Sequence, residues 1–188
     1  MNGHVALWRG FQTYAVDLAT KVRSRLGVSL YERLDVRQLA VVYGLSIVSF
    51  DQLSSVSEAV HYFTETHTRQ LSGFVAQVDS QQVILINPAN CDERIASTIT
   101  HEVSHCILCH ESKLRLTGEQ ACLSGDPDQE DEASWLGGEL LVPREAARRL
   151  VFRRVDEVEA AAMFGVSIEM TRWRMNICGG RQMQRRAK

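Results

Sequence analysis

Two histidines separated by three residues, with a glutamate directly after the first, are the feature that most constrains this chain: His101, Glu102 and His105 in the segment HEVSH. If the segment is helical, both imidazoles project from one face and can bind a single Zn²⁺ ion. Glu102 then lies beside the metal and can accept a proton from water that the metal activates. The flanking residues 95–100 and 106–108 contain no Pro or Gly, which makes a continuous helix around the motif plausible. The alternative for the motif alone is an ordinary amphipathic helix that carries two histidines.

A catalytic zinc usually takes three protein ligands, and the acidic residues Glu130, Asp131 and Glu132 are candidates for the third. They begin a second predicted helix, which carries apolar residues at positions 133, 136 and 140 on one face. Glu132 lies four residues before Leu136 and is expected on that inward face. Asp131 is rotated away from this face, and so is Glu130 for most of the length of its side chain. The alternative is that these acids only favour a helix N-terminus, with Asp128 as its N-cap.

These two segments resemble the ImmA/IrrE family of bacterial metallopeptidases. The family combines the pattern HExGH with ExEANxFAxxLLMP, and this chain has HEVSH followed by EDEASWLGGELLVP. The resemblance implies that Glu132, the glutamate before Ala133, is the third zinc ligand. It covers nearly the whole chain, with further similar segments at residues 35–40, 43–45, 83–87 and 164–167 and at Arg172. The departures from the family pattern remove neither a ligand nor the base; they are Ser104, Ser134, Gly137 and Gly138.

The order of hydrophobic patterns predicts an α+β fold. We expect a mostly helical single domain spanning residues 1–188, with a small antiparallel sheet packed on a zincin-like HExxH metal helix. The elements expected before the metal helix are a helix near 11–26, a short helix 36–43 stopped by Gly44, a strand 45–50, a mixed polar segment 52–70, and a hairpin of 73–78 with 83–86. A loop near 111–127 follows the metal helix, and the rest of the chain is predicted to be helical.

A helix pair near residues 156–177 resembles a helix-turn-helix, with Ser167 as the N-cap of its second helix. One interpretation is contact with DNA, to which the basic tail 179–188 would add positive charge. The other interpretation, which we favour, is that the pair packs on the rest of the domain. The tail is predicted to be disordered.

Composition and charge narrow the class of protein. The net charge of −2 argues against a general polyanion binder. Arg9 and Asp17 interrupt the apolar pattern of the first twenty residues, which are therefore neither a signal peptide nor a membrane span. Five cysteines, an odd number, fit reduced thiols in the cytoplasm. The sequence CxxCH at residues 106–110 also fits covalent haem attachment, but haem proteins of that type are exported, so packed thiols are favoured.

Two cysteines are candidates for an inhibitory fourth ligand, because thiolate binds zinc strongly. Cys122 lies in the loop between the two ligand-bearing helices, and Cys109 follows His105 by one helical turn. An ordinary structural cysteine is the alternative for each. The second oxyanion donor is not identified by the sequence; the remaining histidines, which are more often structural or exposed, are His4, His61, His67 and His110. Of these, His110 is expected to interact with the C-terminal carbonyls of the metal helix.

The motif predicts a water-activating hydrolase with Glu102 as base and His101, His105 and Glu132 as Zn²⁺ ligands. Mn²⁺ is an alternative ion, because two histidines and a carboxylate are not exclusive to zinc. The resemblance implies a cytoplasmic endopeptidase that cleaves a separate helix-turn-helix repressor and so induces a stress-response, mobile-element or phage-defence operon. A protease-type toxin of a toxin–antitoxin pair is one alternative. A metal-binding, DNA-associated regulator without peptidase activity is another, against which the intact Glu102 argues.

Overall fold

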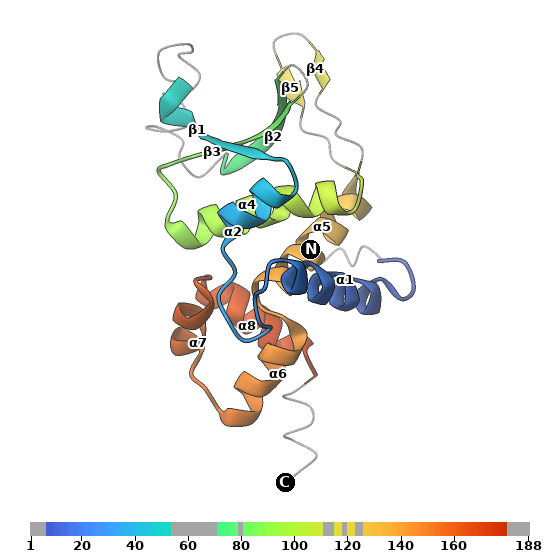
Figure 1. Ribbon diagram of the computed structural model, residues 1–188, viewed down its shortest axis with the longest axis vertical. Helices are drawn as coiled ribbons and strands as arrows, with labels where there is room; N and C mark the ends of the chain where they lie inside the picture. Colours follow the sequence, from blue (N-terminus) through green and yellow to red (C-terminus); the bar gives the residue numbers. More distant parts are fainter. Residues whose placement is uncertain are drawn as a thin grey trace.

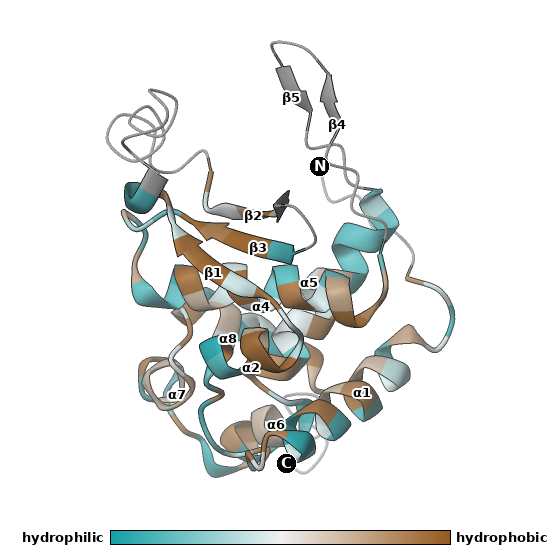
Figure 2. Cartoon of the chain, turned by 45° about the horizontal axis from the view of Figure 1, so that its top comes forward, coloured by the Kyte–Doolittle hydropathy of each residue, from teal (hydrophilic) through white to brown (hydrophobic). Residues whose placement is uncertain are grey.

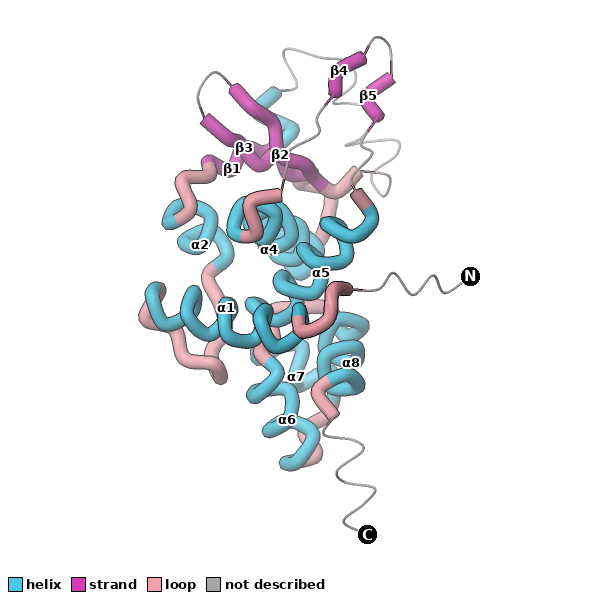
Figure 3. Tube along the Cα trace, turned by 90° about the vertical axis from the view of Figure 1, so that its right-hand side faces the viewer, coloured by secondary structure: helices cyan, strands magenta, loops and turns pink. Residues whose placement is uncertain are grey.

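The sheet lies at one end of the molecule, helices α2 and α4 lie beneath it, and α1, α6, α7 and α8 lie toward the other end (Figures 1 and 3). The computed structural model describes residues 7–53, 71–78, 81–110, 115–117, 120–122 and 126–179. Its helices are α1 (Phe11–Arg25), α2 (Val36–Val42), α4 (Asp92–Ile107), α5 (Pro127–Leu141), α6 (Arg144–Arg153), α7 (Glu157–Phe164) and α8 (Ile168–Ile177), with a 3₁₀ helix η1 (Phe50–Leu53). Across these described ranges, no helix is long and apolar enough to cross a membrane.

The principal sheet contains β1 (Ser46–Ser49), β2 (Gly73–Val78) and β3 (Gln81–Ile86) in the order β1-β3-β2. Strands β2 and β3 form the predicted antiparallel hairpin, but β1 runs parallel to β3. The α+β class is confirmed, whereas the sheet is mixed rather than purely antiparallel. No tight turn connects β1 to its neighbour, and the hairpin signal therefore carried no information about the direction of β1.

A second antiparallel pair, β4 (Arg115–Thr117) with β5 (Gln120–Cys122), lies within the segment that the sequence predicted as a loop. The backbone of Cys122 pairs with that of Arg115 in this ladder. Residues 54–70 and the predicted basic tail from residue 180 onward lie outside the described residues.

Helix α4 buries one polar stripe together with its apolar residues. Thr100 and Ser104 are fully buried, and each hydroxyl donates to the carbonyl four residues earlier, at 2.8 Å and 2.7 Å respectively. These bonds satisfy hydroxyls that would otherwise be buried without a partner. A Cβ placed on Gly137 of α5 would lie 3.6 Å from Ser104 Oγ and 3.7 Å from His101 Cα. Helices α4 and α5 are therefore in direct contact at this glycine.

Helix α5 begins two residues earlier than the sequence suggested. The N-cap is Asp126, whose carboxylate accepts a hydrogen bond from the Asp128 backbone N–H at 3.1 Å, so Asp128 is not the cap. Pro127 occupies the first helical position, where its missing N–H has no helical partner to lose. This start places the acidic residues 130–132 in the first turns of the helix, directly beside α4.

Two apolar clusters meet at α5. Leu136 and Leu140 belong to the cluster that includes β3, α1, α2 and α4, while Leu141 and Val142 belong to the cluster of α6, α7 and α8. Apolar residues run along β3, drawn brown in Figure 2, on the sheet that covers α4. Helix α5 is therefore the element that fixes the C-terminal helices relative to the metal helix.

The C-terminal helix pair packs against α5. Ser167 is the N-cap of α8, as predicted, and accepts a hydrogen bond from the Met170 backbone N–H at 3.1 Å. A Cβ on Gly138 of α5 would lie 2.3 Å from the indole of Trp173, so α8 approaches α5 at a position that only glycine allows. This packing supports the favoured interpretation, in which the helix pair is part of the core.

Candidate active site

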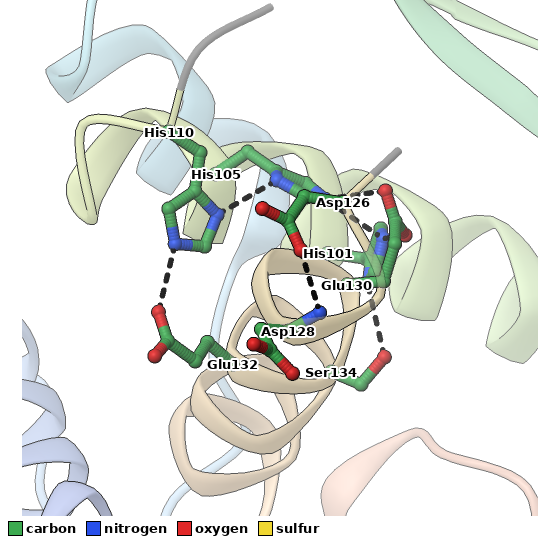
Figure 4. Close-up of polar contacts among 8 residues, drawn as sticks. All are labelled: His101, His105, His110, Asp126, Asp128, Glu130, Glu132 and Ser134. Carbon is green, nitrogen blue, oxygen red and sulfur yellow. Dashed lines mark hydrogen bonds and ion pairs between the residues drawn. The ribbon is translucent and has the colours of Figure 1, made fainter. Parts of the chain in front are cut away.

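Three side chains converge where α4 meets the start of α5. His101 Nε2 lies 3.1 Å from His105 Nε2 and 3.1 Å from Glu130 Oε2. His105 Nε2 lies 3.6 Å from Glu130 Oε1. Figure 4 shows the two imidazoles of α4 and the Glu130 carboxylate of α5 pointing toward one another. Among the described residues, these are the three whose donor atoms are grouped closely enough to hold a metal ion.

The spacing of these donor atoms fits a tetrahedral metal. Ligands about 2.0–2.1 Å from a tetrahedral zinc ion lie about 3.3–3.4 Å from one another. The three measured separations, 3.1, 3.1 and 3.6 Å, bracket that value. Two histidines and one carboxylate are also a donor set that catalytic zinc sites use. The side chains therefore fit a metal ion without rearrangement of either helix.

Glu132, which the sequence favoured as the third ligand, lies elsewhere. Its Oε2 is 3.1 Å from Nε2 of His110, and Glu130 takes the position beside the two histidines. The ligand position is decided by which face of α5 packs against α4. That face contains Glu130, Ser134 and Gly137, whereas a residue two positions after Glu130 is rotated by about 200° around the helix. The sequence argument selected the most apolar face, which packs on the core instead.

Burial changes the acid–base properties of the metal-site histidines. Desolvation lowers the pKa of His101, and it lowers the pKa of His105 to about 4, with the neighbouring His101 as a further cause. Both imidazoles are therefore neutral at pH 7, which is the form that binds metal ions.

Glu102 has the opposite shift. Burial first, and then the charge of Glu130, raise the pKa of its carboxyl to about 7. A carboxyl with a pKa near the working pH can both accept and return a proton, which is the requirement for a general base that later acts as an acid.

Each metal-site histidine has a second contact through its other ring nitrogen. Nδ1 of His101 lies 3.4 Å from Ser134 Oγ, and Nδ1 of His105 lies 2.9 Å from Nδ1 of His110. The sequence suggested that His110 contacts the carbonyl groups at the end of α4. Its backbone N–H does bond to the His105 carbonyl at 2.9 Å, but its side chain contacts the His105 ring and Glu132. Sequence reasoning gave neither Ser134 nor His110 this role.

Cys109, one of the two cysteines considered as inhibitory ligands, is not in the three-residue cluster. Cys109 follows the end of α4, is exposed, and has a left-handed backbone with φ of 55°. The helical spacing that placed it one turn beyond His105 on the same face therefore does not apply. The side chain of Cys122 lies outside the described residues, as do His4, His61 and His67. Cys106 is a free, half-buried thiol whose pKa is raised by burial, and it packs against the core as a structural cysteine would.

A mixed sheet above a helix that carries HExxH, with a carboxylate from the next helix facing both histidines, defines a metallopeptidase-like α+β domain. Comparison with protein families agrees with that class. The family model of the M78 peptidases, described as the IrrE N-terminal-like domain, matches residues 48–176, and this chain belongs to that family. The resemblance of the two motifs to the ImmA/IrrE metallopeptidases is thereby confirmed. No match to a curated protein or to a solved structure was found.

Proposed function

We propose that this protein is a zinc-dependent endopeptidase that cleaves a separate helix-turn-helix transcriptional repressor, and that cleavage induces a stress-response, mobile-element or phage-defence operon. The observation that carries the proposal is the convergence of His101, His105 and Glu130, with donor atoms 3.1 to 3.6 Å apart, beside Glu102. Family membership supports the peptidase chemistry. The identity of the substrate rests on the resemblance to the ImmA/IrrE family.

In this proposal His101, His105 and Glu130 hold the ion, and Mn²⁺ is the alternative to zinc for this donor set. A bound zinc ion supplies Lewis-acid activation of water and of the scissile carbonyl. Glu102 is the catalytic base: its carboxylate accepts the proton of the attacking water and returns it to the leaving amine.

The C-terminal helices support an enzyme over a DNA-associated regulator. Arg174 of α8 is 1% exposed and paired with the equally buried Glu139 of α5, so this arginine is committed to the interior. On the outer side, Arg172 pairs with Glu157 of α7 at 2.8 Å. Two arginines of the second helix thus have partners within the protein. Free thiols at Cys91, Cys106 and Cys109 also suit the reducing cytoplasm in which we place the reaction.

Incubation with the repressor encoded by the neighbouring gene tests the proposal. The wild-type protein, loaded with zinc, is expected to produce two defined fragments, identified by mass spectrometry. Chelation should stop cleavage, and added zinc should restore it. Glu102→Gln should bind zinc and fold normally but cleave at least about 10³-fold more slowly, because the base is lost. Cleavage by Glu102→Gln at the wild-type rate would contradict the mechanism, and an intact repressor would contradict the substrate.

A further inference from the structure

We infer that His110 and Glu132 form a positioning chain behind the metal site, in which Glu132 orients His110 and His110 orients His105 for metal binding. The inference rests on the proposed function in one respect, that His105 is a metal ligand. It assigns a role to two residues that do not contact the ion. It also explains why a second glutamate lies two residues after Glu130 without joining the ligand set.

Three side chains in series make up the chain. Glu132 Oε2 lies 3.1 Å from His110 Nε2, and His110 Nδ1 lies 2.9 Å from His105 Nδ1. The His105 ring then presents Nε2 to the cluster, 3.1 Å from His101 Nε2. Figure 4 shows the series running from Glu132 on α5 to His110 and then to His105 on α4. Both nitrogen atoms of each imidazole are therefore in use.

The chemistry of the groups fixes the direction of each hydrogen bond. A carboxylate can only accept, so His110 must donate from Nε2 to Glu132. When the His110 ring carries one proton, on Nε2, its Nδ1 has a lone pair, and His105 donates to it from its own Nδ1. The proton of His105 is thereby held on Nδ1, which leaves the Nε2 lone pair free for the metal. The reverse tautomer of His105 would place a proton on the atom that must bind the ion.

The backbone after α4 builds this contact. Cys109 adopts a left-handed conformation at φ 55°, and its N–H bonds to the Cys106 carbonyl at 3.1 Å. The N–H of His110 bonds to the His105 carbonyl at 2.9 Å. This pair of bonds is a Schellman motif, which brings the residue after the left-handed position against the residue five before it. An apolar pair commonly fills that contact; here two imidazoles fill it, with ring centroids 5.0 Å apart.

The burial of His110 and Glu132 indicates that these two side chains depend on each other for hydrogen bonds. The side chains of His110 and Glu132 are 7% and 18% exposed, compared with 26%, 20% and 47% for His101, His105 and Glu130. The supporting pair is thus less accessible to water than the ligand cluster. A buried polar group without a partner costs about 1–3 kcal/mol, so removal of Glu132 would leave His110 without its acceptor. The ring could then turn away from His105.

Zinc affinity of the full-length protein, measured by competition with a chromophoric chelator, tests the chain without a substrate. His110→Ala and Glu132→Ala are each expected to weaken zinc binding about 10- to 100-fold. Glu132→Gln keeps an acceptor oxygen and should lose much less. Asp131→Asn, on the same turn of α5, is the matched control and should bind as the wild type does. The double variant His110→Ala/Glu132→Ala should bind no more weakly than the weaker single variant, because both residues act through one contact.

The tautomer of His105 provides a readout that a purely structural role would not change. In the metal-free wild-type protein, nitrogen-15 NMR of the imidazoles should show the His105 proton on Nδ1. In folded His110→Ala and Glu132→Ala, the population with the proton on Nε2 should increase. Circular dichroism identifies any variant that fails to fold, and the single variant that does fold then carries the test.

Several results would overturn the inference. Unchanged zinc affinity and tautomer in both single variants would show that the contacts have no positioning role. Additive losses in the double variant would show that the residues do not act in series. Abolished zinc binding in Glu132→Ala, as severe as in His105→Ala, would mean that Glu132 is itself a ligand. Failure to cleave the repressor would refute the proposed substrate but would leave the zinc affinities and the tautomer measurement unaffected. Failure of the wild-type protein to bind zinc would refute the metal site, and the His105 tautomer would still test the positioning role of His110 and Glu132.

Discussion

Glu139 of α5 and Arg174 of α8 form an ion pair in the interior of the protein, where their side chains are 3% and 1% exposed. Arg174 Nε also donates to the Val142 carbonyl at 2.9 Å, and the Glu139 carboxylate accepts from the Arg144 backbone N–H. Burial lowers the pKa of Arg174, while Glu139 acts in the opposite direction. One buried pair therefore connects the end of α5 with α6 and with the last helix described.

Glu139→Gln should destabilise the protein strongly, because it leaves the Arg174 charge buried without its counter-ion. The expected cost is about 3–5 kcal/mol, measured by urea denaturation. Glu157→Gln is the matched control, because it breaks a pair with Arg172 whose side chains are 25% and 53% exposed. That exposed pair should contribute no more than about 1 kcal/mol. Equal effects of the two substitutions would contradict the importance assigned to the buried pair.

The two adjacent glycines of α5 should respond oppositely to alanine. At Gly138 a Cβ would lie 2.3 Å from Trp173, and Gly138→Ala is expected to cost about 1–3 kcal/mol through displacement of that indole. At Gly137 the nearest atoms would be 3.6 Å away, an ordinary contact. Gly137→Ala should therefore be neutral or stabilise α5 by up to about 1 kcal/mol. Thermal denaturation of the two variants provides the comparison, and the reverse order would be inconsistent with the packing described.

Zinc stoichiometry distinguishes the two candidate third ligands. Glu130→Ala should lose zinc nearly as completely as His105→Ala does, because the Glu130 carboxylate is within 3.1 Å of the histidine cluster. Glu132→Ala should retain one zinc per chain at saturating metal, although with weaker affinity. Elemental analysis after dialysis against excess zinc measures both. Full occupancy in Glu130→Ala together with an empty site in Glu132→Ala would restore the ligand set expected from the sequence.

Glu102 should reduce the stability of the metal-free protein at alkaline pH. Its carboxyl has a pKa of about 7 in the folded protein and 4.5 as the reference. The folded state thus binds the proton more tightly, and the cost of the ionised form develops as pH rises from 4.5 to 7 and is complete above 7. Glu102→Gln should therefore raise the free energy of unfolding by roughly 1–3 kcal/mol at pH 8 and by much less at pH 5. The melting temperature at the two pH values measures this difference. An equal gain at both pH values would contradict the burial of an ionised group.

The elements with strong local signals were predictable from the sequence. The HExxH helix, the β2–β3 hairpin and the Ser167 cap depend on short-range periodicity and capping chemistry, and the structure contains all three. Arg23 shows where such signals end. The helical pattern of α1 does not mark it as buried, yet it is 0% exposed and donates to the Leu140 carbonyl at 2.5 Å, far away in the chain.

The choice between Glu130 and Glu132 needed information that the sequence does not carry locally. Both residues lie in the first turns of α5, and the decision depends on which face meets α4. That face is a property of the packed pair of helices, in which Ser134 and Gly137 of α5 lie beside His101. The contact of His110 with His105 was similarly hidden, because a cysteine rather than a glycine occupies the left-handed position that creates it.

That cysteine provides the last prediction. Cys109 has φ of 55°, a conformation that costs a residue with a Cβ about 1–2 kcal/mol relative to glycine. Cys109→Gly should therefore maintain or raise the stability of the protein and keep His110 against His105. The Cys109→Val variant should be about 1–2 kcal/mol less stable than the Cys109→Gly variant, because a β-branched residue is strongly disfavoured in this conformation. Urea denaturation compares the two, and zinc affinity in the same variants reports on the contact. If Cys109→Val were as stable as Cys109→Gly and bound zinc equally well, the left-handed turn would not be what holds His110 in place.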